Sequence, residues 1–143
     1  MTPSKRRMTA LDLFSFQMVD DPQVSPDGQH VAWVRTWMEP EQNGYRSSIV
    51  VTDLHTGSSV MVTQLDGLCT HPRWSPDGRW LAYIAAGAQS LQDDGGPRSS
   101  VSVVDHGAQL MLTRPDGGDA IQLTNLRGGV RAPVWSPDGH AIA

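Results

Sequence analysis

Three serines in this chain are each followed by proline, aspartate and glycine, and serine, histidine and aspartate are the residue types of a hydrolytic triad. Ser25, Ser75 and Ser136 begin these Ser-Pro-Asp-Gly copies, and five histidines are scattered through the same 143 residues. In a hydrolytic triad, histidine takes the proton of a serine and an acid orients the histidine. The first question is therefore whether any of these serines is a nucleophile or only part of a turn.

The form of the tetrapeptide favours a turn. Proline sets φ at the first central position of a turn, aspartate bonds to nearby backbone N–H groups, and glycine takes the left-handed conformation. A hydrolase nucleophile needs a strained strand-to-helix turn, usually Gly-x-Ser-x-Gly, and the sequence contains no such pattern. Three equivalent copies also argue against one active serine. We therefore predict no catalytic residue among Ser25, Ser75 and Ser136.

Other polar residues are predicted to form no metal or cofactor site. Aspartates placed once per repeat are separated in space, so turn stabilisation explains them better than paired carboxylates do. The adjacent pair Asp93-Asp94 is followed by glycines and favours a solvated loop, with a weak ion or peptide-amine contact as the alternative. The histidines lack ligand spacing, and one cysteine cannot build a cysteine-rich site. The residues considered are Asp27, Asp77, Asp138, His30, His55, His71, His106, His140 and Cys69.

Composition indicates a globular protein without a nucleic-acid or membrane partner. The hydrophobic fraction is 38%, the charged fraction is 18% and the formal net charge is −4. The only basic run, Lys5-Arg6-Arg7, is expected to be a solvated tail. Polar residues such as Asp12 and Asp20 interrupt any apolar leader, so we expect no signal peptide, no membrane span and a cytoplasmic location.

Repetition organises the whole chain. The prolines of the three tetrapeptides are Pro26, Pro76 and Pro137, and the intervals between them are typical of propeller blades. Each copy is preceded by an X-Pro-X-X run and followed by a short apolar run, which predicts a strand, a turn and a second strand. A second hairpin follows, with strands expected at 48–53 and 59–63, and again at 109–113 and 120–124. The segment 101–105 is the alternative third strand of the second unit.

The second hairpin keeps the register of the repeat. Thr113 and Thr124 follow Thr52 and Thr63 by the same interval that separates Pro137 from Pro76. This shared interval, called the repeat offset below, is the reason for preferring 109–113 over 101–105 as the third strand.

These units predict an all-β fold, a partial propeller of four-stranded antiparallel blades. The expected division is a tail and short helix at 1–20, blade 1 at 21–70, blade 2 at 71–131 and the start of a third blade at 132–143. Thr9-Ala-Leu-Asp12 has the form of a capping box and predicts a helix from Thr9 to near Gln17. The third unit stops at Ala143, inside an expected strand, which favours a truncated reading frame.

Tryptophans are expected mainly to pack between blades. Trp33, Trp74, Trp80 and Trp135 fall on the predicted strands. Trp37 is placed in a loop beyond its strand, with Tyr45 and Arg46, and is the one aromatic residue considered for a ligand-facing rim; packing is the favoured interpretation there too.

The repeat resembles that of TolB-like propellers. The likeness rests on Trp-Ser-Pro-Asp-Gly, on the Leu-Ala-Tyr strand after it, and on the ending Gly117-Gly118-Asp-Ala-Ile-Gln-Leu123-Thr124. The segment from Leu11-Asp-Leu-Phe14 to His30-Val-Ala-Trp-Val-Arg35 also resembles the beginning of prolyl oligopeptidase family serine peptidases, especially acylaminoacyl-peptidase-like members. That resemblance implies a propeller over a C-terminal α/β-hydrolase domain, which is absent here, so no catalytic residue can be assigned from it.

Three hypotheses remain from the sequence. In the first, the chain is the propeller part of such a peptidase and screens peptides for the missing catalytic domain. In the second, it is a TolB-like binding module without hydrolase activity, against which the missing export signal counts. In the third, it is a short protein that completes a propeller by self-association through exposed blade edges.

Overall fold

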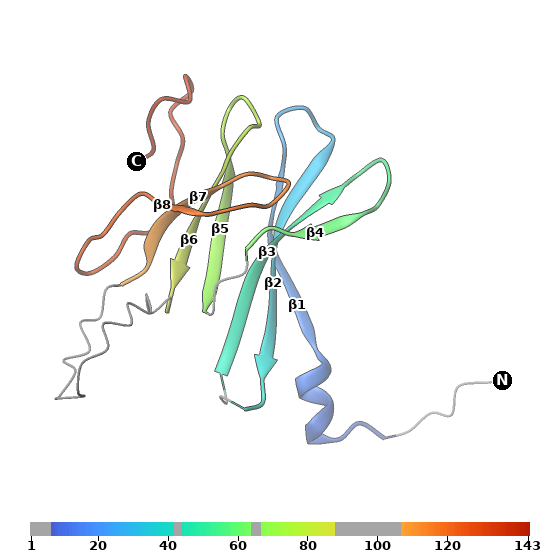
Figure 1. Cartoon of the computed structure of the whole chain (residues 1–143). Coiled ribbons are helices and arrows are strands. Elements are labelled where there is room, and N and C mark those ends of the chain that lie inside the picture. The colour runs from blue at the N-terminus through green and yellow to red at the C-terminus, as the bar shows by residue number, and fades with distance from the viewer. Residues whose placement is uncertain (1–6, 42–43, 64–66, 88–106) are drawn as a thin grey trace.

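The computed structural model describes residues 7–41, 44–63, 67–87 and 107–143, and almost all of its regular structure is β-strand (Figure 1). One short helix, η1, precedes eight strands. Their bounds are η1 Ala10–Ser15, β1 Gln17–Val24, β2 His30–Glu39, β3 Gly44–Asp53, β4 Ser59–Met61, β5 Leu68–Trp74, β6 Leu81–Ala86, β7 Gln109–Thr113 and β8 Ile121–Gln122.

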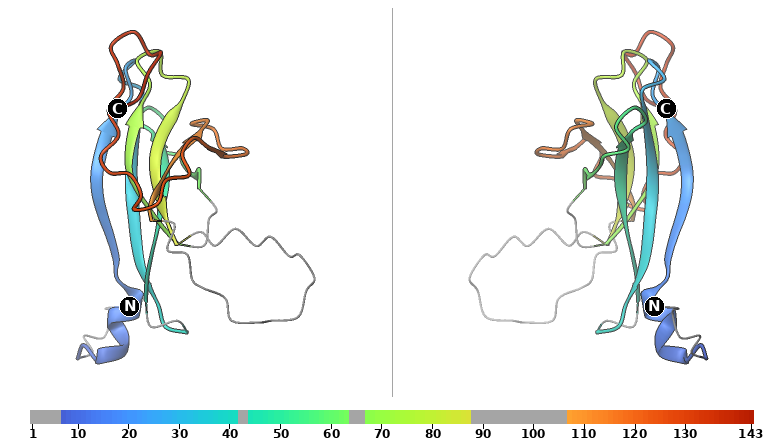
Figure 2. Two further views of the ribbon diagram at one scale, coloured as in Figure 1. Left: turned by 90° about the vertical axis from the view of Figure 1, so that its left-hand side faces the viewer. Right: turned by 90° about the vertical axis from the view of Figure 1, so that its right-hand side faces the viewer.

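The strands form two antiparallel units of four. Strands β1 to β4 pair in order and are called blade 1; β5 to β8 pair in order and are called blade 2. Among the described residues one parallel ladder pair, Ser47 with Leu68, joins β3 to β5, and through it the eight strands formally make one open sheet. The long strands of both blades run side by side when viewed edge-on (Figure 2). The predicted all-β architecture is confirmed.

A third unit begins after blade 2. Trp135 pairs with Ile142 across a turn, and Val134 and Ala143 exchange backbone hydrogen bonds of 2.9 Å in both directions. This arrangement repeats the strand, turn and strand that open the two blades.

The X-Pro steps of blades 1 and 2 are bulges in the first strand of each blade, and the third X-Pro step has the same backbone conformation. Asp21, His71 and Ala132 directly precede a proline and have φ values of 46°, 54° and 48°. The pairing of β1 with β2 shifts between Asp20 and Gln23, and that of β5 with β6 shifts between Thr70 and Arg73. Proline lacks the N–H that ladder pairing needs, and a bulge removes that need. The proline within β1 and the proline within β5 are therefore each accommodated by a bulge.

Strand assignments agree with the repeat, with two corrections at the N-terminal side. The capping box at Thr9 and Asp12 forms, with the Thr9 N–H 2.6 Å from the Asp12 carboxylate, but the helix is 3₁₀ and ends at Ser15. Gln17 already begins β1, because residues 17–20 pair with β2 instead of continuing a helix. The longer β2 also includes Trp37, which pairs with Arg46 of β3, so the loop predicted around Trp37 is wrong.

For the third strand of blade 2, the structure supports the preferred choice. β7 covers Gln109–Thr113 and pairs along its length with β6. The alternative segment 101–105 lies outside the described residues.

The main core lies between the blades. Ala32, Val34, Ile49 and Val51 of blade 1 are buried in one cluster with side chains of the second blade, and Trp74 packs against it. The second blade contributes Cys69, Leu81, Tyr83 and Ala85 to this cluster. A smaller cluster of Ala82, Ile84 and Leu110 lies on the other face of blade 2, where Trp135 and Ile142 of the third unit pack. Blade 2 thus uses both faces, as stacked sheets require.

Candidate functional site

The three Ser-Pro-Asp-Gly turns have the same geometry. Each serine hydroxyl donates to the aspartate two residues later, at 2.5, 2.6 and 2.5 Å. Each serine oxygen also accepts a backbone N–H from five residues later, at 2.9, 3.0 and 2.9 Å. The glycines Gly28, Gly78 and Gly139 have φ values of 70°, 71° and 72°, a conformation that glycine adopts without strain. The prediction that these tetrapeptides are turns is confirmed.

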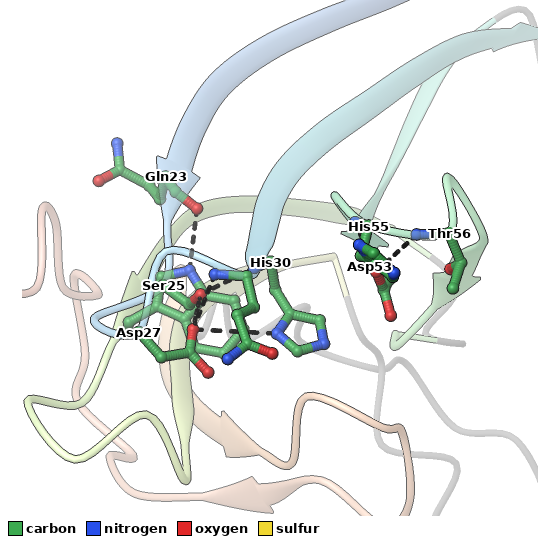
Figure 3. Close-up of polar contacts among 9 residues, drawn as sticks. Gln23, Ser25, Asp27, His30, Asp53, His55 and Thr56 are labelled. Atoms are coloured by element: carbon green, nitrogen blue, oxygen red, sulfur yellow. Dashed lines mark hydrogen bonds and ion pairs between the residues drawn. The ribbon is translucent and has the colours of Figure 1, made fainter.

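Ser25, Asp27 and His30 lie together but do not form a catalytic triad (Figure 3). In a triad the serine hydroxyl bonds to histidine, and the histidine bonds to the acid. Here the Ser25 hydroxyl donates directly to Asp27, and only the backbone N–H of His30 reaches the Ser25 oxygen. The Nδ1 atom of the His30 ring lies 4.0 Å from an Asp27 carboxylate oxygen. The histidine ring is therefore not placed to take the serine proton as it would in a triad.

The other two turns show that the histidine is not needed. The position of His30 is occupied by Trp80 in the second copy and by Ala141 in the third, and the serine–aspartate bond is unchanged. Ser25 and Ser75 are also buried, at 5% and 2% exposure. The shared chemistry of the three copies is turn formation.

Hydrogen bonding lowers the pKa of each turn carboxyl. For Asp27, Asp77 and Asp138 the largest cause is the serine hydroxyl, followed by a backbone N–H two residues later, both of which stabilise the charged form. Asp53, at the turn between β3 and β4, behaves in the same way. Its carboxylate accepts the N–H groups of His55 and Thr56 at 2.8 and 2.9 Å, which lowers its pKa (Figure 3).

Contacts that the sequence did not predict connect the first strands of successive units. The Trp74 indole N–H donates to the carbonyl of Gln23 at 2.9 Å, and the Trp135 indole N–H donates to the carbonyl of Arg73 at 3.0 Å. Both bonds use equivalent positions in successive repeats. Arg73 also forms an ion pair of 2.8 Å with Asp21. The repeated tryptophan indicated packing, but its hydrogen-bond acceptor is a backbone carbonyl, which the residue types in the sequence cannot identify.

Other residues considered from the sequence are not brought together. Across the described ranges, no three histidine, cysteine, aspartate or glutamate side chains are grouped to hold a metal ion. Asp93, Asp94 and His106 lie outside those ranges. Burial raises the pKa of the Cys69 thiol, which lies in the core between the blades. Among the described residues, no helix is long and apolar enough to cross a membrane.

Replacing Ser75 by alanine should destabilise the chain by about 1–2 kcal/mol. The change removes the bond to Asp77 and leaves the part-buried N–H of Trp80 without its 3.0 Å acceptor. Urea unfolding followed by tryptophan fluorescence measures the effect. Ser136→Ala is the matched control and should cost less, because Ser136 is more exposed. Equal stability of Ser75→Ala and the wild type would contradict the turn's role.

Acid should weaken the turns. The pKa of each turn aspartate is lower in the folded chain than in the unfolded chain. The contribution of its carboxylate to the stability of the fold is therefore complete above the unfolded pKa, which is near 4, and is lost as the pH falls through the lower folded pKa. Urea midpoints measured from pH 6 down to pH 2.5 should therefore fall below about pH 4. The variant Asp27→Asn/Asp77→Asn/Asp138→Asn should start lower and fall less steeply; an equally steep fall would assign the acid sensitivity to other groups.

Comparison with known proteins relates the chain to peptidases. No family model matches it. The uncharacterized peptidase YuxL of Bacillus subtilis is 38% identical over 138 residues, which are 96% of this chain and 19% of that protein. Dipeptidyl-peptidase 5 of Porphyromonas endodontalis is 28% identical over 99% of this chain and 18% of its own length. The chain thus spans less than a fifth of these relatives.

Solved structures of low sequence identity share the fold. Acylaminoacyl peptidase of Pyrococcus horikoshii matches with a TM-score of 0.65 and 22% identity, over 90% of this chain and 17% of its own. The β-propeller domain of the Trilobed protease from Pyrococcus furiosus matches at 0.64 with 20% identity, over 89% and 33%. TolB from Acinetobacter baumannii matches at 0.59 with 23% identity, over 88% and 26%. The predicted TolB-like propeller and its resemblance to the propeller regions of peptidases are confirmed.

Proposed function

We propose that this chain, which resembles the propeller region of prolyl oligopeptidase family peptidases, screens the peptides that reach an α/β-hydrolase domain. The observation that carries the proposal is the 38% identity to a peptidase across 96% of this chain. None of the three turn serines is hydrogen-bonded to a histidine ring, so in this proposal the propeller contributes selection and the hydrolase domain contributes the nucleophile.

The linked first strands support a screening role. Blades of a propeller surround a central channel. In this chain, β1 and β5 are held together by the Trp74–Gln23 hydrogen bond and the Asp21–Arg73 ion pair. If the first strands of successive blades are held at a fixed distance by these contacts, the width of the central channel that they surround stays constant. We infer that a peptide is selected by whether it fits such a channel, and we place the parent protein in the cytoplasm.

The proposal can be tested on the native protein. Antibodies against this chain would be used to precipitate the polypeptide that carries it from its source cells, after labelling with a fluorophosphonate that reacts with active serines. We expect the precipitated polypeptide to be labelled and to cleave acyl-aminoacyl or dipeptidyl substrates. An unlabelled polypeptide without peptidase activity would overturn the proposal and favour a TolB-like binding module.

This chain by itself should not hydrolyse these substrates. None of its turn serines has a histidine in position to act as base, and all three donate to an aspartate. Chromogenic acyl-aminoacyl and dipeptidyl substrates provide the assay, and the triple variant Ser25→Ala/Ser75→Ala/Ser136→Ala is the control. Turnover by the wild type that disappears in this variant would refute the prediction.

A further inference from the structure

Four aspartates of the chain are preceded by proline and followed by glycine, and all four are exposed. Three belong to the Ser-Pro-Asp-Gly turns. The fourth is Asp116 in Arg114-Pro-Asp-Gly117, which connects β7 to β8 (Figure 1). By the repeat offset, Asp116 corresponds to His55 of blade 1, so this copy is not part of the repeat. Asp66 and Asp94 also precede glycine but lie outside the described residues.

The backbone closes in the same way at all four steps. In the three Ser-Pro-Asp-Gly turns, the glycine N–H donates to the serine carbonyl at 2.9 Å. At the fourth step, the Gly117 N–H donates to the carbonyl of Arg114 at 3.1 Å. Gly117 has a φ value of 91°, in the same left-handed region as the turn glycines. The four aspartate side chains can therefore be compared on similar backbones.

The four carboxylates differ in their partners. In each Ser-Pro-Asp-Gly turn, one carboxylate oxygen accepts the serine hydroxyl and also the backbone N–H two residues later, at 3.0, 3.1 and 3.0 Å. At the fourth step Arg114 replaces serine and has no hydroxyl to donate. Its guanidinium carbon lies 5.1 Å from the ring centre of Trp80. The Asp116 carboxylate makes no hydrogen bond or ion pair with any described residue.

An aspartate followed by glycine can react with its own backbone. The glycine nitrogen forms a bond to the aspartate Cγ, and the hydroxyl of the neutral carboxyl leaves as water with the proton of that nitrogen. The product is a cyclic succinimide. Water then opens the ring at the backbone carbonyl, so that the chain continues through the side chain as isoaspartate. One water is lost and one is gained, and glycine has no Cβ to obstruct the close approach.

We propose that Asp116 is a site of spontaneous isomerisation to isoaspartate, and that the three Ser-Pro-Asp-Gly turns resist the same reaction. Ring formation in those turns would break both hydrogen bonds of the carboxylate oxygen. The same bonds stabilise the charged carboxylate and so disfavour the neutral carboxyl that the reaction consumes. At Asp116 there are no such bonds to break. The product has a free α-carboxylate, the group that a repair methyltransferase specific for isoaspartate would methylate.

The modification would act on the hairpin at the outer edge of blade 2. Asp116 lies in the connection between β7 and β8, which pair at Met111 with Gln122 and at Leu112 with Ile121. Isoaspartate adds one methylene group to the backbone of this connection. The register of a hairpin depends on the length and type of its turn. The proposed site therefore lies where a change in backbone length alters strand pairing.

Incubation of the full chain in water enriched in heavy oxygen tests the proposal, because each ring opening incorporates one heavy oxygen atom. At about pH 5 the turn carboxylates remain ionised. Mass spectrometry with electron-transfer fragmentation then locates the label and distinguishes isoaspartate from aspartate. We expect both to accumulate several-fold faster at Asp116 than at Asp27, Asp77 or Asp138. Asp116→Glu is the matched control and should lose the signal, because its longer side chain forms the corresponding ring much more slowly.

Two further comparisons assign the difference to the turns. In the chain unfolded by urea, the four Pro-Asp-Gly steps should react at similar rates, because their neighbours are the same. In the folded chain, Ser136→Ala should raise the rate at Asp138 several-fold and leave the rate at Asp27 unchanged. Circular dichroism shows whether this variant is folded.

Three outcomes would overturn the inference. The first is the absence of isoaspartate at Asp116, and the second is an equal rate at all four steps of the folded wild type. The third is a rate at Asp138 that Ser136→Ala leaves unchanged, which would contradict protection by the serine hydroxyl. None of these results depends on the fluorophosphonate experiment, so failure of one proposal is distinguishable from failure of the other.

Discussion

Replacement of Tyr83 by alanine should lower the free energy of unfolding by about 3–5 kcal/mol, the range for a large aromatic residue removed from a core. Tyr83 is fully buried in the cluster between the blades, and it pairs with Met111 across β6 and β7. Its loss leaves a cavity bordered by residues of both blades. Among the described residues only one strand-ladder pair, Ser47 with Leu68, joins the blades, so side-chain packing of this kind contributes to their cohesion beside the hydrogen bonds and the ion pair between them.

Tyr83→Phe separates packing from the hydroxyl. The Tyr83 oxygen is buried and has no hydrogen-bond partner in the described part of the chain, and this burial raises the pKa of the group. Removing an unpaired buried hydroxyl while keeping the ring should be neutral or stabilising. Urea unfolding of wild type, Tyr83→Phe and Tyr83→Ala gives the comparison. A loss in Tyr83→Phe as large as that in Tyr83→Ala would show that the hydroxyl, and not the ring, is the stabilising group.

Local features of the fold could be predicted because the sequence repeats them in successive units. The Ser-Pro-Asp-Gly turn depends on residues within five positions of one another, and each copy forms the same bonds. The third strand of blade 2 was correctly placed because residues 109–113 keep the repeat register with residues 48–52, and β7 has those bounds. Repetition gave each of these assignments an independent check.

Predictions failed where pairing between distant residues decides the structure. The capping box at Thr9 predicted a longer helix, but residues 17–20 gain hydrogen bonds from β2 and become a strand. Similarly, Trp37 was placed in a loop because nothing beside it indicates that Arg46 is its partner. Tertiary pairing overrides local propensity at both positions.

The candidate site was predictable in its chemistry but not in its contacts. Turn residues were recognised as unreactive from residue type and repetition alone. The bonds from Trp74 to Gln23 and from Trp135 to Arg73 use backbone carbonyls, which every residue has, so residue types could not identify them. The Asp21–Arg73 pair joins residues in successive blades and has no counterpart at His71 and Val134, so the repeat gave no second copy to reveal it.

Replacement of Trp74 by alanine is the second large effect, with an expected loss of about 3 kcal/mol. Trp74 packs against the main cluster, and its indole N–H donates to Gln23 of blade 1. Trp74→Phe keeps much of the ring and removes the hydrogen bond, so it should cost only about 1 kcal/mol. Urea unfolding followed by far-UV circular dichroism measures both variants without relying on the tryptophan signal that the change removes.

Trp135→Ala is the matched control, since Trp135 makes the equivalent indole–carbonyl bond but packs against the smaller cluster of Ala82, Ile84 and Leu110. If packing between full blades is the main source of stability, the loss in Trp74→Ala should exceed that in Trp135→Ala, whereas Trp74→Phe and Trp135→Phe should lose similar amounts. Equal losses in both alanine variants would instead show that the hydrogen bond, which the two positions share, determines the stability of the interface. The four variants thus separate two contributions to the stability of the contact between successive units. One is the packing of the tryptophan ring, and the other is the indole–carbonyl hydrogen bond that both positions make.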